Sequence, residues 1–261
     1  MEKKSLFHTL ILFFLLLAVV SFPIDLFVKD MIVQYSVRVG LNVFYLIFSL
    51  LYIHFSKFIP SYTGRTRIAN LLILLPLFFI AFTNPFYVVI IRQTASFNTI
   101  FNSIYKAFST NPTFEILTLV NLILLAINEE IFFRFVFQRV LLIAHKMLRI
   151  FASAGMFSLC HLLQYLFNFS ALIDNIPNAL VQLVYTFFIG VVIGVLYEYT
   201  NNISFATLFH ILFNLSNDYL YNSLDSGTIS LPYYINALCF GIFGIAYICI
   251  FYFLILKRDK R

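Results

Sequence analysis

Two adjacent carboxylates and an arginine lie inside a segment that is otherwise apolar. Glu129, Glu130 and Arg134 follow an uncharged run, residues 116–128, and the next three residues are apolar again. A charged side chain at the centre of a bilayer costs at least about 2.5–3.5 kcal/mol, so such residues face the interior of a helix bundle and have partners there. In a helix, Glu130 and Arg134 lie four residues apart on one face and can pair, whereas Glu129 points about 100° away. The alternative is a helix end whose charged side chains extend to the membrane interface.

The composition is that of a polytopic membrane protein. Of the 261 residues, 62% are hydrophobic and 11% are charged, whereas soluble domains carry about 25% charged residues. The net charge of +6 comes from basic residues in short loops and at the chain ends rather than from one patch, which argues against a nucleic-acid partner. The three cysteines lie in apolar runs without CxxC spacing, so they indicate neither a disulfide framework nor a zinc ribbon.

Long apolar runs predict an all-α transmembrane bundle of about eight spans. A helix needs about 20 apolar residues to cross a bilayer. No soluble domain, repeat or linker interrupts the runs, so we expect one integral-membrane domain, residues 1–261. Residues 92–112 are polar and predict a loop or an interfacial helix, and residues 135–149 predict a helix that emerges into the interface. Gly190 and Gly194 have the GxxxG spacing of closely packed membrane helices. The expected spans are residues 6–22, 40–55, 68–91, 113–134, 150–167, 179–199, 203–220 and 232–256.

The distribution of basic residues predicts that both termini are cytoplasmic. Eight spans place the two termini on one side, and that side collects most of the Lys and Arg residues of the short loops. The opposite side begins with a polar connection that carries Asp25, Lys29, Asp30 and Arg38. The basic residues of the terminal side are Lys3, Lys4, Lys57, Arg65, Arg67, Arg139, Lys146, Arg149 and those of the C-terminal tail.

Two further predicted spans carry histidines with a second notable residue on the same helix face. His161 follows Phe157 by four residues, and His210 precedes Asn214 by four. One histidine in a span is usually a packing residue, but packing does not explain two histidines together with two glutamates and an asparagine. A buried glutamate can take a proton from water, and a histidine and an amide side by side can donate to an oxyanion. This set of side chains is suited to hydrolysis of a peptide bond with water as the nucleophile.

Other hydrolytic mechanisms find less support in the sequence. GxSxG and HExxH are both absent, which argues against a serine mechanism and against the usual zinc-protease helix. A zinc site formed by His161, His210 and Glu130 is still chemically allowed, because two histidines, a carboxylate and an open position form a catalytic pattern.

Taken in order, the polar motifs resemble those of the CPBP family. This family comprises CAAX prenyl endopeptidases of the Ras-converting type and bacteriocin-processing or bacteriocin-immunity proteins, also called Abi proteins. The resemblance covers about residues 113–220, and the first three spans carry no matching motif. Phe135 stands where the family usually has a small residue. The motifs are Glu129-Glu130-x-x-x-Arg134, Phe157-x-x-x-His161 and His210-x-x-x-Asn214.

The resemblance implies an all-helical intramembrane endopeptidase. It gives Glu129 the role of the base that activates water, with His161 beside it. Glu130 and Arg134 would support and orient this site, and the histidine and asparagine of the third motif would form the oxyanion clamp. Family members are described both as metalloproteases and as glutamate-dependent proteases without a catalytic metal, so the resemblance leaves the need for zinc open.

The resemblance and the composition together suggest a location and a substrate class. Abundant Phe, Ile, Leu and Asn without any Trp indicates an AT-rich bacterial genome, and many bacterial members of the family have no prenylated CAAX substrates. We therefore expect a multi-pass protein of a bacterial plasma membrane that cuts a membrane-associated protein or peptide, in bacteriocin immunity or in peptide processing.

Two functions without proteolysis compete with this expectation. A bacteriocin-immunity or partner-binding membrane protein would use the polar cluster as a buried structural network. A small transporter would use one of the glutamates as a proton site, but the sequence shows no inverted repeat or second broken helix to support it.

Overall fold

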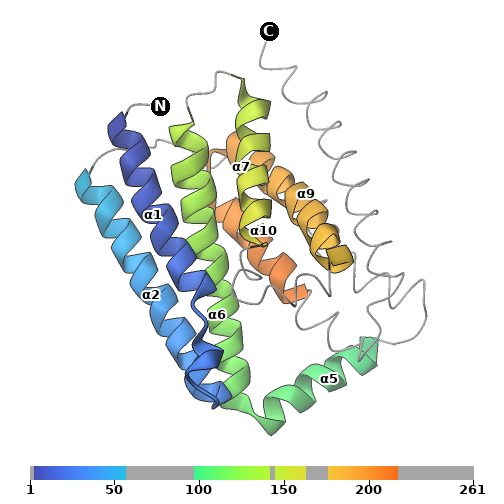
Figure 1. Ribbon diagram of the computed structural model, residues 1–261. Helices are drawn as coiled ribbons and strands as arrows, with labels where there is room; N and C mark the ends of the chain where they lie inside the picture. Colours follow the sequence, from blue (N-terminus) through green and yellow to red (C-terminus); the bar gives the residue numbers. More distant parts are fainter. Residues whose placement is uncertain (1–2, 57–96, 142–144, 163–175, 217–261) are drawn as a thin grey trace.

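The computed structural model describes residues 3–56, 97–141, 145–162 and 176–216, and this part of the chain is all-α (Figure 1). The prediction of the fold class is confirmed there. The predicted spans 68–91 and 232–256 lie outside the described residues, so the count of eight spans, the side of the termini and the single domain of residues 1–261 stay predictions. The described helices are α1 (Lys3–Ser21), η1 (Ile24–Leu26), α2 (Met31–Ser56), α5 (Phe97–Thr110), α6 (Pro112–Glu130), η4 (Ile131–Gln138), α7 (Lys146–Cys160), α9 (Ile176–Thr200) and α10 (Ile203–Leu215).

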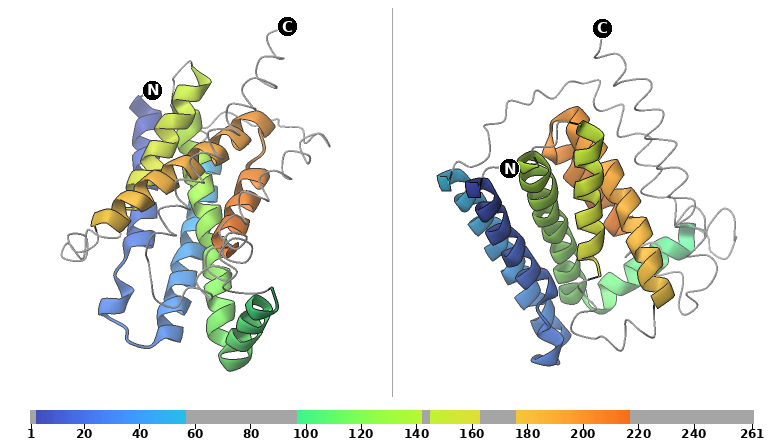
Figure 2. Two further views of the ribbon diagram at one scale, coloured as in Figure 1. Left: turned by 90° about the vertical axis from the view of Figure 1, so that its right-hand side faces the viewer. Right: turned by 45° about the horizontal axis from the view of Figure 1, so that its top comes forward.

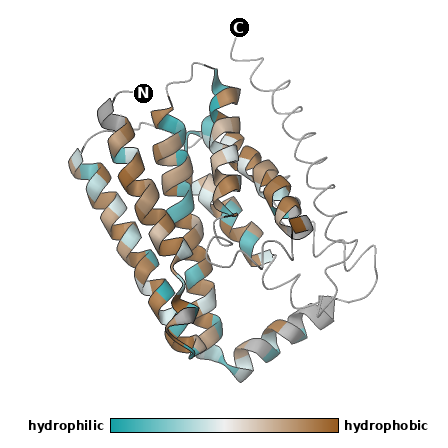
Figure 3. Ribbon diagram, viewed as in Figure 1, coloured by the Kyte–Doolittle hydropathy of each residue, from teal (hydrophilic) through white to brown (hydrophobic). Residues whose placement is uncertain are grey.

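Two of the described helices are long and apolar enough to cross a membrane. They are α2, with 26 residues, and the continuous helix Pro112–Gln138, with 27 residues, formed by α6 and η4. Both exceed the length of about 20 residues that a bilayer requires. Hydrophobic residues also predominate along α1, α9 and α10 (Figure 3). These observations rest on length and composition, and they agree with a membrane location.

The helix formed by α6 and η4 occupies the middle of the described bundle. Helices α1 and α2 pack on one side of it, and α7, α9 and α10 lie on the other (Figures 1 and 2). Phe132, Phe133 and Val136 of η4 are buried against Leu12 of α1 and Tyr45 of α2. The helix that carries the charged residues is therefore enclosed by apolar neighbours rather than exposed at the edge.

Helix α2 begins nine residues before the predicted start at residue 40, and the structure shows why. Asp30 precedes the helix, and its carboxylate accepts a hydrogen bond at 3.0 Å from the backbone N–H of Val33. An aspartate at this position satisfies one of the free N–H groups of the first turn, so the helix can begin within a polar stretch. Arg38 therefore lies inside α2 and not in the connection where the sequence placed it.

The predicted helix of residues 135–149 is divided between two helices. The central helix continues from α6 through η4, a π-helix that ends at Gln138. A separate helix, α7, then begins at Lys146 and ends at Cys160, so it starts and ends earlier than the predicted span 150–167. Short stretches of π-helix are rare and frequently occur at functional sites, and this one directly follows the two glutamates.

The GxxxG pair of α9 packs against α7, as its spacing predicted. A Cβ atom added to Gly190 would lie 3.1 Å from both Cα and Cβ of Ala154, and one added to Gly194 would lie 3.0 Å from Ile150. A side chain at Gly190 would crowd the backbone of α7, and one at Gly194 would crowd the side chains of Ile150 and Gln138, so glycine favours the close approach of α7 and α9. This close contact brings α7, and with it Ser153, against the central helix.

We expect Gly190→Leu to destabilise the protein by about 1–3 kcal/mol, the usual cost of overpacking a closely packed contact. The measurement is the midpoint of thermal unfolding in detergent. Gly155→Ala is the matched control, because a Cβ at Gly155 meets nothing within 4 Å and alanine favours the helix. Equal midpoints for Gly190→Leu and wild type would show that α7 and α9 do not depend on this contact.

Candidate active site

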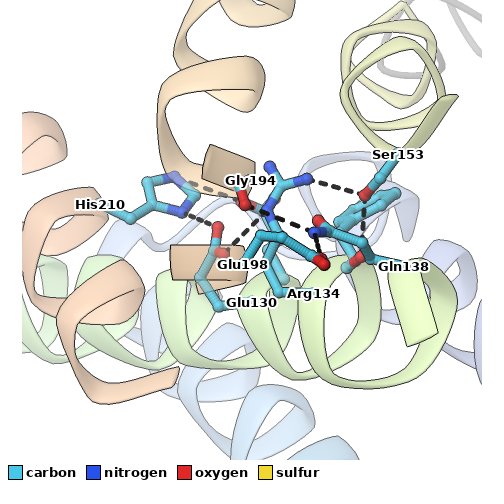
Figure 4. A network of polar contacts seen from close by, with 9 residues as sticks. Glu130, Arg134, Gln138, Ser153, Gly194, Glu198 and His210 are labelled. Atoms are coloured by element: carbon cyan, nitrogen blue, oxygen red, sulfur yellow. Dashed lines mark hydrogen bonds and ion pairs between the residues drawn. The ribbon is translucent and has the colours of Figure 1, made fainter. Parts of the chain in front are cut away.

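The end of α6 places two glutamates in the interior of the bundle. Glu130 and Arg134 are completely buried, and Glu129 is 8% exposed. Arg134 Nε donates to Glu130 Oε2 at 3.2 Å (Figure 4). The predicted pairing across one turn is therefore confirmed, and the alternative of charges that extend to the interface is wrong for these two side chains.

Arg134 is held by a second helix as well. Its Nη1 donates at 2.8 Å to the hydroxyl of Ser153 in α7, and that hydroxyl donates at 2.8 Å to the carbonyl oxygen of Phe133. The guanidinium carbon lies 5.4 Å from the ring centroid of Phe157, within the range of a cation–π contact. Sequence reasoning missed Ser153, because one serine in an apolar helix has no spacing that marks it.

His210 of α10 lies between the two glutamates. Its Nδ1 is 2.8 Å from Glu130 Oε1 and its Nε2 is 3.6 Å from Glu129 Oε2. The histidine ring also meets the ring of Phe157 edge-on, with 5.7 Å between the centroids. The structure thus joins residues that the sequence separates by 80 positions, and it forms a buried contact between two carboxylates and one imidazole.

His161 and Asn214 lie on the helix faces that the sequence predicted, His161 with Phe157 and Asn214 with His210. His161 follows the last residue of α7, and its Nδ1 is 2.9 Å from the carbonyl oxygen of Phe157, with 4.6 Å between the ring centroids. His161 is half-buried and lies within electrostatic range of Glu129. Asn214 is half-buried one turn beyond His210 in α10.

Comparison with known protein families gives a match that includes these residues. Residues 111–216 match the family model described as type II CAAX prenyl endopeptidase Rce1-like. This segment is an Rce1-like domain of the CPBP family. The resemblance inferred from the three motifs is confirmed, and the Rce1-like domain contains all seven residues that the motifs name. Comparison with curated proteins and with solved structures gave no match.

Membership of the Rce1-like domain in this family implies an intramembrane protease of the CAAX type that acts on a protein or peptide. The buried cluster of Glu129, Glu130 and His210 is consistent with such an activity. The role of each residue within the cluster is taken up below as a proposal.

A second polar group lies farther along the central helix of the Rce1-like domain. Gln138 Nε2 donates to Glu198 Oε2 at 3.1 Å and to the carbonyl oxygen of Gly194 at 3.4 Å. Glu198 Oε1 pairs with Arg149 Nη2 at 2.6 Å. Sequence reasoning assigned Gln138 and Arg149 to the interface and did not pair them, because their partner lies in another helix. This group ties η4, α7 and α9 together beside the glutamate cluster.

Of the three residues considered for zinc, His210 and Glu130 contact each other, and His161 Nδ1 lies 2.9 Å from the carbonyl oxygen of Phe157. His210 Nδ1 is within hydrogen-bond distance of a Glu130 oxygen, and its Nε2 faces Glu129. Within the described part of the chain, no three His, Cys, Asp or Glu side chains are grouped as metal ligands. The set His161, His210 and Glu130 does not fit a zinc ion in this arrangement, and no step below is derived through a metal.

We expect Arg134→Met to destabilise the protein by about 3–5 kcal/mol, because it leaves the carboxylate of Glu130 buried without its cation. The matched control is Arg149→Met, whose ion pair with Glu198 is 19–25% exposed and should contribute about 0–1 kcal/mol. Thermal unfolding in detergent measures both. A smaller loss in Arg134→Met than in Arg149→Met would contradict the importance assigned to the buried pair.

Proposed function

We propose that the chain is an intramembrane endopeptidase that hydrolyses a peptide bond in a membrane-associated protein or peptide. The observation that carries this proposal is the buried contact of His210 with both glutamates inside an Rce1-like domain. A carboxylate that can accept a proton, next to an imidazole and away from bulk water, is an arrangement suited to general acid–base catalysis.

The contacts of the two glutamates support a division of roles. Both oxygens of Glu130 are engaged, one with His210 and one with Arg134. Within the described part of the chain, Glu129 makes the longer contact of 3.6 Å with His210, and its side chain is 11% exposed. Glu129 is therefore the glutamate that can reach a water molecule, and Glu130 is the one that positions its neighbours.

In the proposed reaction Glu129 takes a proton from water. The oxygen of that water bonds to the carbonyl carbon of the substrate, and the C–N bond then breaks while the amine receives the proton from Glu129. His161, within electrostatic range of Glu129, would help to hold the water. Because Glu129 returns to its starting state, the chain is unchanged at the end of each cycle.

His210 and Asn214 are proposed to donate to the oxyanion that forms on the substrate carbonyl. A Glu130 carboxylate paired with Arg134 can only accept, so the proton of the 2.8 Å contact lies on His210 Nδ1. For Nε2 to donate as well, the ring must be doubly protonated, and the two glutamates would compensate that charge. Asn214, one turn away on α10, would provide the second donor.

The finer assignments extend the same proposal. We place the chain in a bacterial plasma membrane with several spans and both termini cytoplasmic, and with a role in bacteriocin immunity or peptide processing. The alternative is a non-catalytic immunity or partner-binding protein, and the complete pairing of Glu130 with Arg134 and His210 supports it, because a purely structural network would look the same.

The decisive test compares wild type with Glu129→Gln, both purified in detergent and offered membrane-anchored peptides with and without a prenyl group. We expect cleavage to fall by about 10²-fold or more in Glu129→Gln, because an amide cannot act as the base. Glu198→Gln is the matched control and should retain activity, since Glu198 lies outside the glutamate cluster. Cleavage by Glu129→Gln at the wild-type rate would refute the assignment.

The same peptides test for a metal and for the alternative function. We expect cleavage to persist after treatment with a strong chelator, because the described side chains do not form a metal site. Loss of cleavage that added zinc restores would instead establish a metalloprotease. If the Glu129→Gln variant protects cells as well as wild type does, that result would support the non-catalytic alternative.

A further inference from the structure

Asn128, the residue immediately before the two glutamates, is bound from a helix outside the Rce1-like domain. Its Nδ2 donates to Asn42 of α2 twice, at 2.8 Å to the side-chain oxygen and at 3.0 Å to the backbone carbonyl. Asn128 is completely buried and Asn42 is 5% exposed. We propose that Asn42 is a positioning residue of the active site, which fixes the direction of Glu129 and Glu130 through Asn128.

Asn42 connects to the central helix at two levels. Its side-chain oxygen accepts from Asn128. Its Nδ2 donates at 3.0 Å to the side-chain oxygen of Asn121, two turns earlier in α6, and at 3.1 Å to the carbonyl oxygen of Arg38. Two contacts seven residues apart on one helix fix its rotation about its own axis as well as its height. The direction of every side chain in the last turn of α6 depends on that rotation.

The place where Asn42 acts is the junction between the α-helix and the π-helix. The backbone N–H of Ile131, the first residue of η4, donates to the carbonyl oxygens of both Asn128 and Ile127. Side chains beyond a change of helix type turn by a different angle per residue. Asn128 thus belongs to the last turn before this change, and a rotation there would separate Glu130 from Arg134 and from His210.

Stability alone does not account for the amide at this position. Among the described residues, the Oδ1 atom of Asn128 is buried and has no hydrogen-bond partner, and a buried unpaired polar atom is costly. An apolar side chain of similar size would avoid that cost, although the side-chain oxygen of Asn42 would then lose its donor. What the amide adds is a directional bond to α2 next to the reacting carboxylates.

The test compares Asn42→Ala with Asn121→Ala. Both substitutions break the hydrogen bond between Asn42 and Asn121, but only Asn42→Ala removes the side-chain acceptor of Asn128. The first readout is the rate at which dicyclohexylcarbodiimide, an apolar reagent that adds to protonated carboxyl groups, modifies Glu129, followed by mass spectrometry of detergent-solubilised protein.

We expect Asn42→Ala to change the rate of modification at Glu129 by about three- to tenfold, the range that corresponds to one hydrogen bond. Asn121→Ala keeps the contact of Asn42 with the last turn of α6, so it should change the rate less than Asn42→Ala does, even if its unfolding midpoint falls equally. Equal rates in Asn42→Ala and wild type would overturn the proposal. If Asn42→Ala does not insert into the membrane, Asn128→Ala is measured instead and is judged by the same outcomes.

The second readout is kinetic and rests on the proposed function. In Asn42→Ala we expect kcat to fall about ten- to a hundredfold at an unchanged KM, because misplaced catalytic groups affect the reaction more than binding. Absence of cleavage by wild type would refute the proposed protease, and the labelling rates would still decide the role of Asn42. Wild-type kcat in Asn42→Ala, with unchanged labelling, would show that Asn42 only joins two helices.

Discussion

The buried ion pair of Glu130 and Arg134 is the interaction on which the rest of the described structure depends. Both side chains have an exposed fraction of zero, and an apolar environment tolerates two charges only where their remaining donors and acceptors are largely satisfied. Ser153 from α7 and His210 from α10 supply partners. These two helices must therefore lie against the central helix, and the glycines of α9 allow α7 to approach closely. The contacts of this buried pair thus help to determine how α7 and α10 pack on the central helix.

The same pair creates an asymmetry between adjacent glutamates that the sequence alone does not show. Each oxygen of Glu130 has a close partner, Arg134 for one and His210 for the other. Glu129, about 100° around the helix, faces the far nitrogen of His210, lies within electrostatic range of His161 and retains some exposure. One imidazole thus lies between a carboxylate with two close partners and a carboxylate that retains some exposure. Neighbouring residues acquire different chemistry because their surroundings differ.

Sequence reasoning identified what depends on spacing along one helix. The pairing of Glu130 with Arg134 and the close packing at the GxxxG pair follow from helical periodicity, and the structure confirms both. The hydrogen bonds of Ser153, and the contact of Gln138 with Glu198, join separate helices and leave no periodic signal. The predicted helix boundaries were wrong where a local feature outweighed hydropathy. The carboxylate of Asp30, for example, caps the first turn of α2, so this helix begins within a polar stretch.

The match to the Rce1-like family begins at residue 111, yet the structural frame of the cluster extends beyond it. Phe132 and Val136 of η4 are buried against Leu12 of α1 and Tyr45 of α2, on the side of the central helix opposite α7 and α9. The amide of Asn42 adds a directional contact to this apolar packing at the level of the glutamates. Helices α1 and α2 carry none of the three motifs, and they contact the central helix through this apolar packing and through Asn42. Packing against the central helix constrains the shape of their buried faces, and the contact with Asn128 requires one amide. At the other positions of these faces, hydrophobic residues of many kinds can satisfy the packing.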